Sequence, residues 1–240
     1  MNVLLTGAAG FVGRPAVDLI GAEHDVTAFD IRPVEHYDRA IQGDVRDYAT
    51  VEAAMAGHDA VVNTIMAPGA SYRMDGPGFD INVRGFLNLL EAARQCRVRR
   101  FVHTSSGAVH TGYPADTFLT HDLYPLRASG MYALSKLVQE ELARNYHEQY
   151  GLSIACIRPW SIIDAERMVT TDGAPVHGYS FGTIDRRDVA RALLCALNAP
   201  DIAYECFYVF ATPGGYKKGD VARTEARLGW KPVYRFDVDL

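Results

Sequence analysis

The stretch from Asn2 to Gly13 reads NVLLTGAAGFVG, and it decides the fold. Its apolar beginning is typical of a short buried strand, which we expect at Asn2–Thr6. Glycines follow at positions 7, 10 and 13, and a helical pattern is expected at Phe11–Ile20. Glycine allows a tight turn and lets a helix pack closely on a strand. The stretch therefore predicts a strand, a glycine-rich turn and a helix in direct succession.

The same alternation of strand and helix continues through the first two-thirds of the chain. Further strands are expected at Asp25–Asp30, Ala40–Asp44, Ala60–Ile65, Arg100–Ser105 and Ser153–Arg158. Further helices are expected at Tyr48–Ala56, Phe79–Arg97 and Ser129–Tyr150. Strands that alternate with helices lie parallel and are joined by right-handed crossovers. The sequence therefore predicts an α/β fold with a doubly wound parallel Rossmann sheet.

The last third of the chain is less regular. Residues Ala165–Gly182 lack a clear period and are expected to form a loop that lines a site. Asp185 is placed to cap a helix at Arg187–Leu197, and a strand at Glu205–Ala211 follows. A short helix is expected at Val221–Leu228. We expect a main domain at 1–160 and a short C-terminal part at 161–240, in which a helix and strand (about 185–211) complete the sheet beside a small substrate-binding region.

Composition and charge exclude several classes of protein. The 240 residues carry 24 Lys and Arg against 29 Asp and Glu, a net charge of −5, which is not the basic surface that binds nucleic acid or anionic membranes. No apolar run reaches membrane-spanning length. The N-terminus has no basic segment or cleavage-site pattern, so we expect no secretory signal and a cytoplasmic location. The four cysteines show neither a CxxC pair nor zinc spacing, so we expect reduced thiols and no metal.

A glycine-rich turn before a helix can bind phosphate, because backbone N–H groups and the helix N-terminus face the anion. Asp30 ends the next predicted strand, 23 positions after Gly7 and close to the roughly 20 expected for a carboxylate that binds an adenosine ribose. Such a carboxylate favours NAD over NADP, although Arg32 can hold a 2′-phosphate and leaves NADP open. Asp44 ends the third predicted strand, where it either meets adenine or forms a turn. The alternative for the glycines is a tight turn without a ligand.

Tyr132 and Lys136 are four residues apart at the start of a predicted helix, so they share one helix face. A nearby cation favours the phenolate and lowers the pKa of a tyrosine, which makes it a general acid or base near neutral pH. Ser106 follows the predicted strand at Arg100–Ser105, and ligands bind beyond the carboxyl ends of such strands. The sequence therefore predicts a hydroxyl beside this tyrosine, with Ser105 as an alternative to Ser106.

These motifs resemble those of the extended short-chain dehydrogenases/reductases, the NAD-dependent epimerase/dehydratase family. Its signature TGxxGFxG is matched at Thr6–Gly13, and the resemblance runs from residue 2 to about 160 and more loosely through Asp185–Ala190 and Leu228–Pro232. The resemblance implies an NAD-dependent oxidoreductase in carbohydrate metabolism, dimeric through its two long helices. It implies a catalytic triad of Ser106, Tyr132 and Lys136. It implies cofactor contacts from Gly7, Gly10, Phe11, Val12, Gly13, Asp30, Arg32, Asp44, Val45, Thr64, Ile65, Asn82, Tyr132 and Lys136.

Within the family, the uronate dehydrogenases give the most similar pattern. By that resemblance Ser106, Ser161 and Arg167 bind substrate, with the arginine on a carboxylate, although Arg167 can equally be a solvated loop residue. Two departures stand out: Gly107-Ala108 replaces a polar Asn-His pair, and Trp160 replaces a small residue. The predicted reaction is hydride transfer from a hydroxyl of a small polar substrate, a sugar or sugar acid. The alternatives are a sugar or nucleotide-sugar epimerase or dehydratase, and a cofactor-sensing protein without catalysis.

Three tyrosines in predicted loops near the strand ends are further candidates for substrate contact. They are Tyr72, Tyr113 and Tyr179. The sequence does not choose among them.

Overall fold

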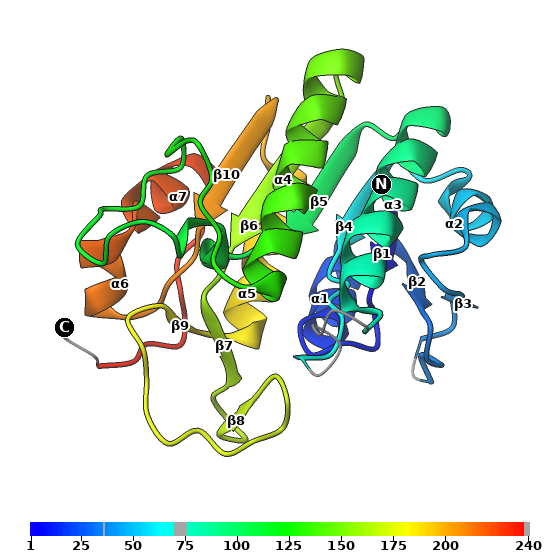
Figure 1. Cartoon of the computed structure of the whole chain (residues 1–240). Helices are drawn as coiled ribbons and strands as arrows, with labels where there is room; N and C mark the ends of the chain where they lie inside the picture. The colour runs from blue at the N-terminus through cyan, green and yellow to red at the C-terminus, as the bar shows by residue number, and fades with distance from the viewer. Residues whose placement is uncertain (36, 70–75, 238–240) are drawn as a thin grey trace.

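A computed structural model describes residues 1–35, 37–69 and 76–237. Its main sheet has the order β10-β6-β5-β4-β1-β2-β3, and all the pairs are parallel (Figure 1). The strands are β1 (Asn2–Thr6), β2 (Asp25–Asp30), β3 (Ala40–Gln42), β4 (Ala60–Asn63), β5 (Arg100–Thr104), β6 (Ser153–Arg158) and β10 (Tyr204–Tyr208). The predicted doubly wound parallel sheet is confirmed.

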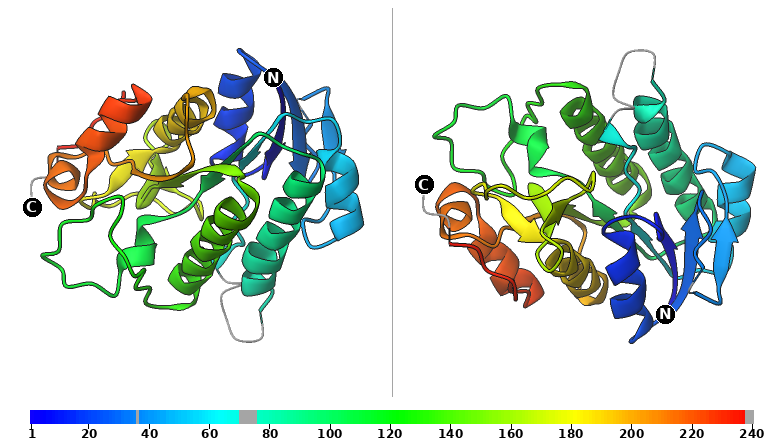
Figure 2. Two further views of the ribbon diagram at one scale, coloured as in Figure 1. Left: turned by 90° about the horizontal axis from the view of Figure 1, so that it is seen from above. Right: turned by 90° about the horizontal axis from the view of Figure 1, so that it is seen from below.

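Helices cover both faces of this sheet (Figures 1 and 2). One face carries α1 (Gly13–Gly21) and α5 (Arg186–Asn198), and the other carries α2 (Tyr48–Met55), α3 (Gly85–Gln95) and α4 (Met131–Tyr150). Two short helices, α6 (Pro213–Lys218) and α7 (Val221–Leu228), pack beyond β10. No helix among the described residues is long and apolar enough to span a membrane.

The two faces of the sheet give two separate apolar cores. In β1, Val3 and Leu5 belong to the core under α1 and α5, whereas Leu4 belongs to the core under α2, α3 and α4. Successive side chains of a strand point to opposite faces, and both faces are covered here. This is why β1 reads as a continuous apolar run instead of an alternating one.

A small second sheet lies below the carboxyl ends of the main strands, with the order β8-β7-β9. It consists of β7 (Ser161–Asp164), β8 (Val169–Thr170) and β9 (Thr183–Asp185). Residues Ala165–Gly182, predicted as a loop, therefore contain one short strand, and β7 and β9 flank them. Strands of two to four residues are too short to show a period in the sequence.

Three helical segments differ from the sequence-based expectation. Helix α1 begins at Gly13 and not at Phe11, so Phe11 and Val12 belong to the turn. The segment predicted as one helix at Phe79–Arg97 starts with a π-helical turn, η2 (Asp80–Arg84), before α3. Helix α6 was not predicted because its sequence contains Gly214 and Gly215; the Thr212 hydroxyl accepts from Gly215 N at 2.9 Å and caps it.

Two buried histidines are held in the neutral form. His110 ends the 3₁₀ turn η3 (Gly107–His110), where its Nδ1 meets the Tyr208 hydroxyl and its Nε2 lies 2.9 Å from the Leu123 carbonyl oxygen. A carbonyl only accepts, so Nε2 carries the proton and Nδ1 accepts from Tyr208. Burial and the nearby Arg158 lower the pKa of His110 to about 4. Burial and Lys136 likewise lower the pKa of His103, which is fully buried on β5.

These pKa shifts predict a loss of stability in mild acid. The unfolded chain protonates both histidines near pH 6.5, whereas the folded chain leaves His110 neutral down to about pH 4. The free energy of unfolding should therefore fall between pH 6.5 and pH 4, by about 1.4 kcal/mol per pH unit for each histidine. Urea titrations from pH 7.5 to pH 4.5 measure this slope. In His110→Gln the free energy of unfolding should fall less steeply with decreasing pH, because the contribution of one histidine is removed. An unchanged slope would contradict the conclusion that buried His110 is neutral.

Candidate active site

The glycine-rich turn closes tightly between β1 and α1. Gly7 has φ +80° and donates from its backbone N to the Phe29 carbonyl oxygen at 2.8 Å. A Cβ at Gly10 would lie 2.8 Å from the Gly7 carbonyl oxygen, and a Cβ at Gly13 only 1.9 Å from it. Side chains are therefore excluded at Gly10 and Gly13, and the turn leaves its backbone open to a cavity of about 410 Å³.

Asp30 joins this turn to the end of β2. Its side chain is almost fully buried, its Oδ2 accepts from Ala9 N at 3.0 Å, and its Oδ1 accepts from Arg32 N at 2.9 Å. Arg32 Nε lies 3.3 Å from the same Oδ1, but the arginine side chain is 59% exposed. Asp30 and Arg32 both line the cavity. A buried carboxylate and an exposed guanidinium thus lie together at this part of the cavity.

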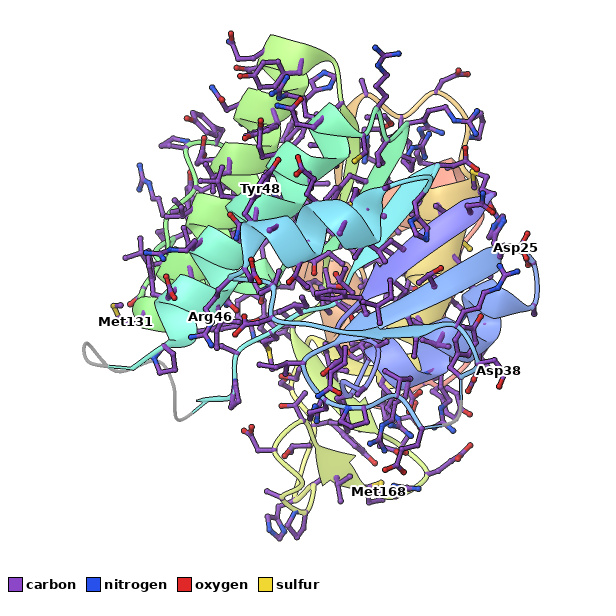
Figure 3. The ribbon with its side chains drawn as sticks, turned by 90° about the vertical axis from the view of Figure 1, so that its right-hand side faces the viewer. Asp25, Asp38, Arg46, Tyr48, Met131 and Met168 are labelled. Carbon is purple, nitrogen blue, oxygen red and sulfur yellow. The ribbon has the colours of Figure 1, made fainter. Side chains whose placement is uncertain are left out.

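The far end of the cavity is closed by Asp44, Val45 and Arg46. Arg46 donates to both carboxylate oxygens of Asp44, with Nη2 2.6 Å from Oδ2, and its Nη1 lies 3.9 Å from Asp80 Oδ2. This hydrogen bond from Arg46 lowers the pKa of Asp44. Arg46 was not predicted as a site residue, and its position two residues after Asp44 was the available signal. Figure 3 shows where Arg46 lies relative to Met131, the first residue of α4.

The loop after β4 forms the wall between the two ends of the cavity. Thr64 and Ile65 line it, and the Thr64 hydroxyl donates to the Thr6 carbonyl oxygen at 2.9 Å. Asn82 lies behind this wall: its Oδ1 accepts from Ala67 N at 3.0 Å and its Nδ2 donates to Ser135 Oγ at 3.0 Å. Of the predicted cofactor residues, all of which the structure describes, Gly13 and Asn82 do not line the cavity, and the others do. The contacts of Asn82 make it a positioning residue that ties this loop to α4.

The predicted catalytic residues meet at the carboxyl end of β5. Ser106 is buried just after the strand, and Tyr132 and Lys136 enter from the first turns of α4. Lys136 is buried and donates from Nζ to the Thr104 carbonyl oxygen at 2.8 Å. The alternative residue, Ser105, donates instead to Glu140 Oε1 at 2.6 Å inside the protein. Ser105 lines the cavity and Ser106 does not, but it is Ser106 that hydrogen-bonds Tyr132, so Ser106 is the hydroxyl beside the tyrosine.

Burial dominates the electrostatics of this pair. It raises the pKa of Tyr132, and a hydrogen bond with Ser106 lowers it only in part. Burial also lowers the pKa of Lys136 to about 8, against the opposing effect of Glu140. The net shift of the tyrosine pKa is thus opposite to the sequence-based expectation, because burial disfavours the charged phenolate. Burial raises the pKa of Tyr132 and lowers that of Lys136, so the two pKa values lie further apart than the ordinary values of the two groups.

A buried ion pair fixes α4 on the sheet. Glu140, one turn after Lys136, accepts from Arg158 Nε at 2.9 Å and from Arg158 Nη2 at 2.6 Å, and both side chains are fully buried. Burial opposes ionisation, but Arg158 and Ser105 hold the pKa of Glu140 below its ordinary value. Glu140, Cys156 and Cys206 also place potential metal-ligand atoms within 4.8 Å of one another. Both carboxylate oxygens of Glu140 already accept hydrogen bonds from Arg158, and the two cysteines are free thiols.

Breaking this ion pair should destabilise the protein strongly. Glu140→Gln leaves the buried Arg158 without a counter-charge, so we expect a loss of about 3–5 kcal/mol in the free energy of unfolding. Urea denaturation measures the loss, and Glu141→Gln at the next position is the matched control, expected within about 0.5 kcal/mol of the wild type. The double variant Glu140→Leu/Arg158→Leu should lose less than the sum of its single variants. Equal losses in Glu140→Gln and Glu141→Gln would contradict this account.

A second cavity of about 580 Å³ adjoins the first, and Tyr132 lines both. Its walls come from the loop after β4 and from the small sheet, including the predicted substrate residue Ser161, which accepts from Ser180 Oγ at 2.8 Å. Arg167 does not line either cavity: its side chain is 75% exposed, with Nε 4.0 Å from Asp164 Oδ2. In this structure Arg167 is therefore a solvated loop residue, which was the alternative to a role in substrate binding. Figure 3 marks the neighbouring Met168 on the β7–β8 hairpin.

Two of the three loop tyrosines also lie away from both cavities. The Tyr113 hydroxyl donates to the Pro125 carbonyl oxygen at 2.7 Å, and the Tyr179 ring packs on Phe236 with centroids 4.9 Å apart. Tyr72 lies outside the described residues. The sequence analysis also gave no site role to Asp172, which lines both cavities from the turn after β8.

Residues 3–172 match the NAD dependent epimerase/dehydratase family, so the chain belongs to that family and is an NAD-dependent enzyme. It is 31% identical over 178 residues to L-arabinose 1-dehydrogenase (NAD(P)(+)) from Haloferax volcanii, covering 70% of this chain and 69% of that enzyme. It is 32% identical over 178 residues to UDP-glucose 4-epimerase from Mycolicibacterium smegmatis, covering 68% of this chain but 56% of the epimerase.

Among solved structures, the fold is similar to a mutant of uronate dehydrogenase from Agrobacterium tumefaciens complexed with NAD. The TM-score is 0.75 at 25% identity, and the match covers 98% of this chain and 85% of that one. The recognised family and the Rossmann-type fold are therefore confirmed, and the relatives include both dehydrogenases and epimerases.

Proposed function

We propose that this chain is an NAD-dependent dehydrogenase that oxidises a hydroxyl of a small polar substrate, a sugar or sugar acid. One observation carries the proposal: Tyr132 lines both the glycine-loop cavity and the adjoining cavity. A general base must reach the proton it removes while the hydride acceptor lies on the other side of the reacting carbon. A tyrosine shared by two adjoining cavities meets that requirement.

The residues around the first cavity fit a dinucleotide. The turn at Gly7, Gly10 and Gly13 excludes side chains where a pyrophosphate would approach, and Asp30 closes the cavity beside it. Lys136 holds the nicotinamide ribose in this proposal, and Val45 covers the adenine. NAD supplies the hydride acceptor when it is bound.

The catalytic side chains of this chain bind the substrate hydroxyl and remove its proton. Ser106 binds and orients the substrate oxygen, and Tyr132 as phenolate removes the hydroxyl proton at Oη. The C–H bond breaks as the hydride leaves, and a carbonyl forms on the same carbon. Lys136 stabilises the phenolate once its ammonium is released from the Thr104 carbonyl.

Removal of the Tyr132 hydroxyl should impair turnover without impairing NAD binding. Tyr132→Phe should lower kcat for NADH formation by about 10²–10⁴-fold, because the general base is lost, while the Kd for NAD stays nearly unchanged. Steady-state assays with NAD and a panel of aldoses, uronic acids and polyols measure the rate, and calorimetry measures the binding. Tyr150→Phe, at the far end of α4 and 55% exposed, is the matched control and should keep full activity. Wild-type turnover in Tyr132→Phe would overturn the assignment.

The second candidate is a sugar or nucleotide-sugar epimerase or dehydratase, favoured by the 32% identity to UDP-glucose 4-epimerase. In such an enzyme the hydride leaves and returns within one turnover. Epimerised or dehydrated product without free NADH, together with NAD that copurifies and does not exchange, would establish this candidate instead.

We also propose that the enzyme is a cytoplasmic homodimer. Helices α3 and α4 lie side by side on one face of the sheet (Figure 2). Leu87 on α3 and Leu134 on α4 are 38% and 41% exposed. Covering such apolar side chains favours self-association. Light scattering should give twice the 26.4 kDa chain mass, and a monomer mass would contradict the dimer. The division of the chain at about residue 160 into a cofactor part and a substrate part belongs to the same proposal.

A further inference from the structure

Trp160 is locked between two glycines at the entrance to β7. A Cβ on Gly107 would lie 2.4 Å from Trp160 Cε3, and a Cβ on Gly182 would lie 2.4 Å from Trp160 Cβ. The Phe181 ring packs beside it with centroids 4.8 Å apart. Neither glycine can gain a side chain without displacing the indole, so the three residues form one unit. The space beside Gly107 is thus filled by an aromatic ring from a different part of the chain.

This indole forms part of the wall of the second cavity, together with Tyr132, Ser161 and Ile162. A rigid aromatic surface beside the reactive hydroxyl provides an apolar wall for a ring-shaped substrate. The apolar C–H face of a sugar ring can pack against such a surface, while its hydroxyls reach the Ser161 and Ser180 hydroxyls, which are 2.8 Å apart.

Among the residues that the structure describes, the lining of this cavity includes one carboxylate, Asp172, and one imidazole, His177, and no lysine or arginine. Asp172 is exposed and lies beside Gly69: a Cβ built on Gly69 would lie 3.7 Å from Asp172 Oδ1, which is ordinary contact distance. Arg186 and Arg187, at the start of α5, are already paired with Asp164 and Asp185 at 2.8 and 2.7 Å. A substrate carboxylate would therefore meet a like charge and no free arginine among these residues.

We propose that this cavity selects uncharged sugars over the corresponding sugar acids, with Trp160 as the wall that packs on the sugar ring and Asp172 as the group that rejects a carboxylate. The inference rests on the proposed dehydrogenase function and names its substrate class. An Asp172 carboxylate accepts hydrogen bonds from neutral hydroxyls, and it repels a carboxylate at the same place. Arg167 has no part in recognition.

The test compares sugars that differ only in one group. D-glucose and D-glucuronate, and D-galactose and D-galacturonate, differ by CH₂OH against COO⁻ at one carbon. With NAD in excess, kcat/KM should be at least about tenfold higher for the neutral member of a pair, the size of effect that one unfavourable contact of 1.4 kcal/mol gives. Asp172→Asn should reduce this ratio by lowering KM for the uronate, and Trp160→Ala should raise KM for the aldose more than Trp160→Phe does.

Arg167→Ala is the control, because this exposed side chain should leave the ratio unchanged. A higher kcat/KM for the uronate than for the aldose would overturn the inference and leave the proposed dehydrogenase function intact. A loss of uronate oxidation in Arg167→Ala would do the same. An unchanged ratio in Asp172→Asn would also overturn it. Absence of NADH with every sugar, in protein that binds NAD, would instead overturn the proposed function and the inference with it.

Discussion

The position of the candidate active site depends on the buried ion pair between Glu140 and Arg158. Tyr132, Lys136 and Glu140 follow one another at intervals of four residues along α4, so anchoring the glutamate to β6 turns the other two toward the ends of the strands. Two charges are removed from water for this purpose, which is tolerated only because each is hydrogen-bonded several times. Asn82 fastens the same helix a second time, through Ser135, to the loop that lines the cofactor cavity.

Much of the fold could be predicted because its main strands are buried on both faces. Such strands read as apolar runs, and the helices between them are long enough to show a period, as β1, β6 and α4 do. The small sheet was not predictable in this way. Its strands have two to four residues, and their partners are set by contacts distant in the sequence, such as Ser161 with Thr183. The π-helical turn at Asp80–Arg84 has no sequence period of its own.

The candidate site likewise has some parts that could be predicted from the sequence and others that could not. The glycine turn, Asp30 and the Tyr132–Lys136 pair follow from local spacing, and the structure brings them to one edge of the sheet. Asn82 lies away from the cavities because tertiary contacts to Ala67 and Ser135 hold its side chain, whereas Arg167 is exposed to solvent. The fit of Trp160 between Gly107 and Gly182 joins three segments, so no single stretch of sequence reveals it. Ser161 in the second cavity was expected from the sequence, whereas the packing of the Trp160 indole was recognised only in the structure.

A crystal structure of the chain with NAD would test the central claim most directly. The account predicts the pyrophosphate over the turn at Gly7–Gly13 and the adenosine ribose at Asp30. It also predicts the nicotinamide ribose at Lys136, with the nicotinamide ring facing the cavity that Tyr132 shares. Tyr132 Oη should then lie within about 2.6–3.2 Å of a bound substrate hydroxyl. A nicotinamide placed away from Tyr132, or NAD bound outside this cavity, would contradict the account.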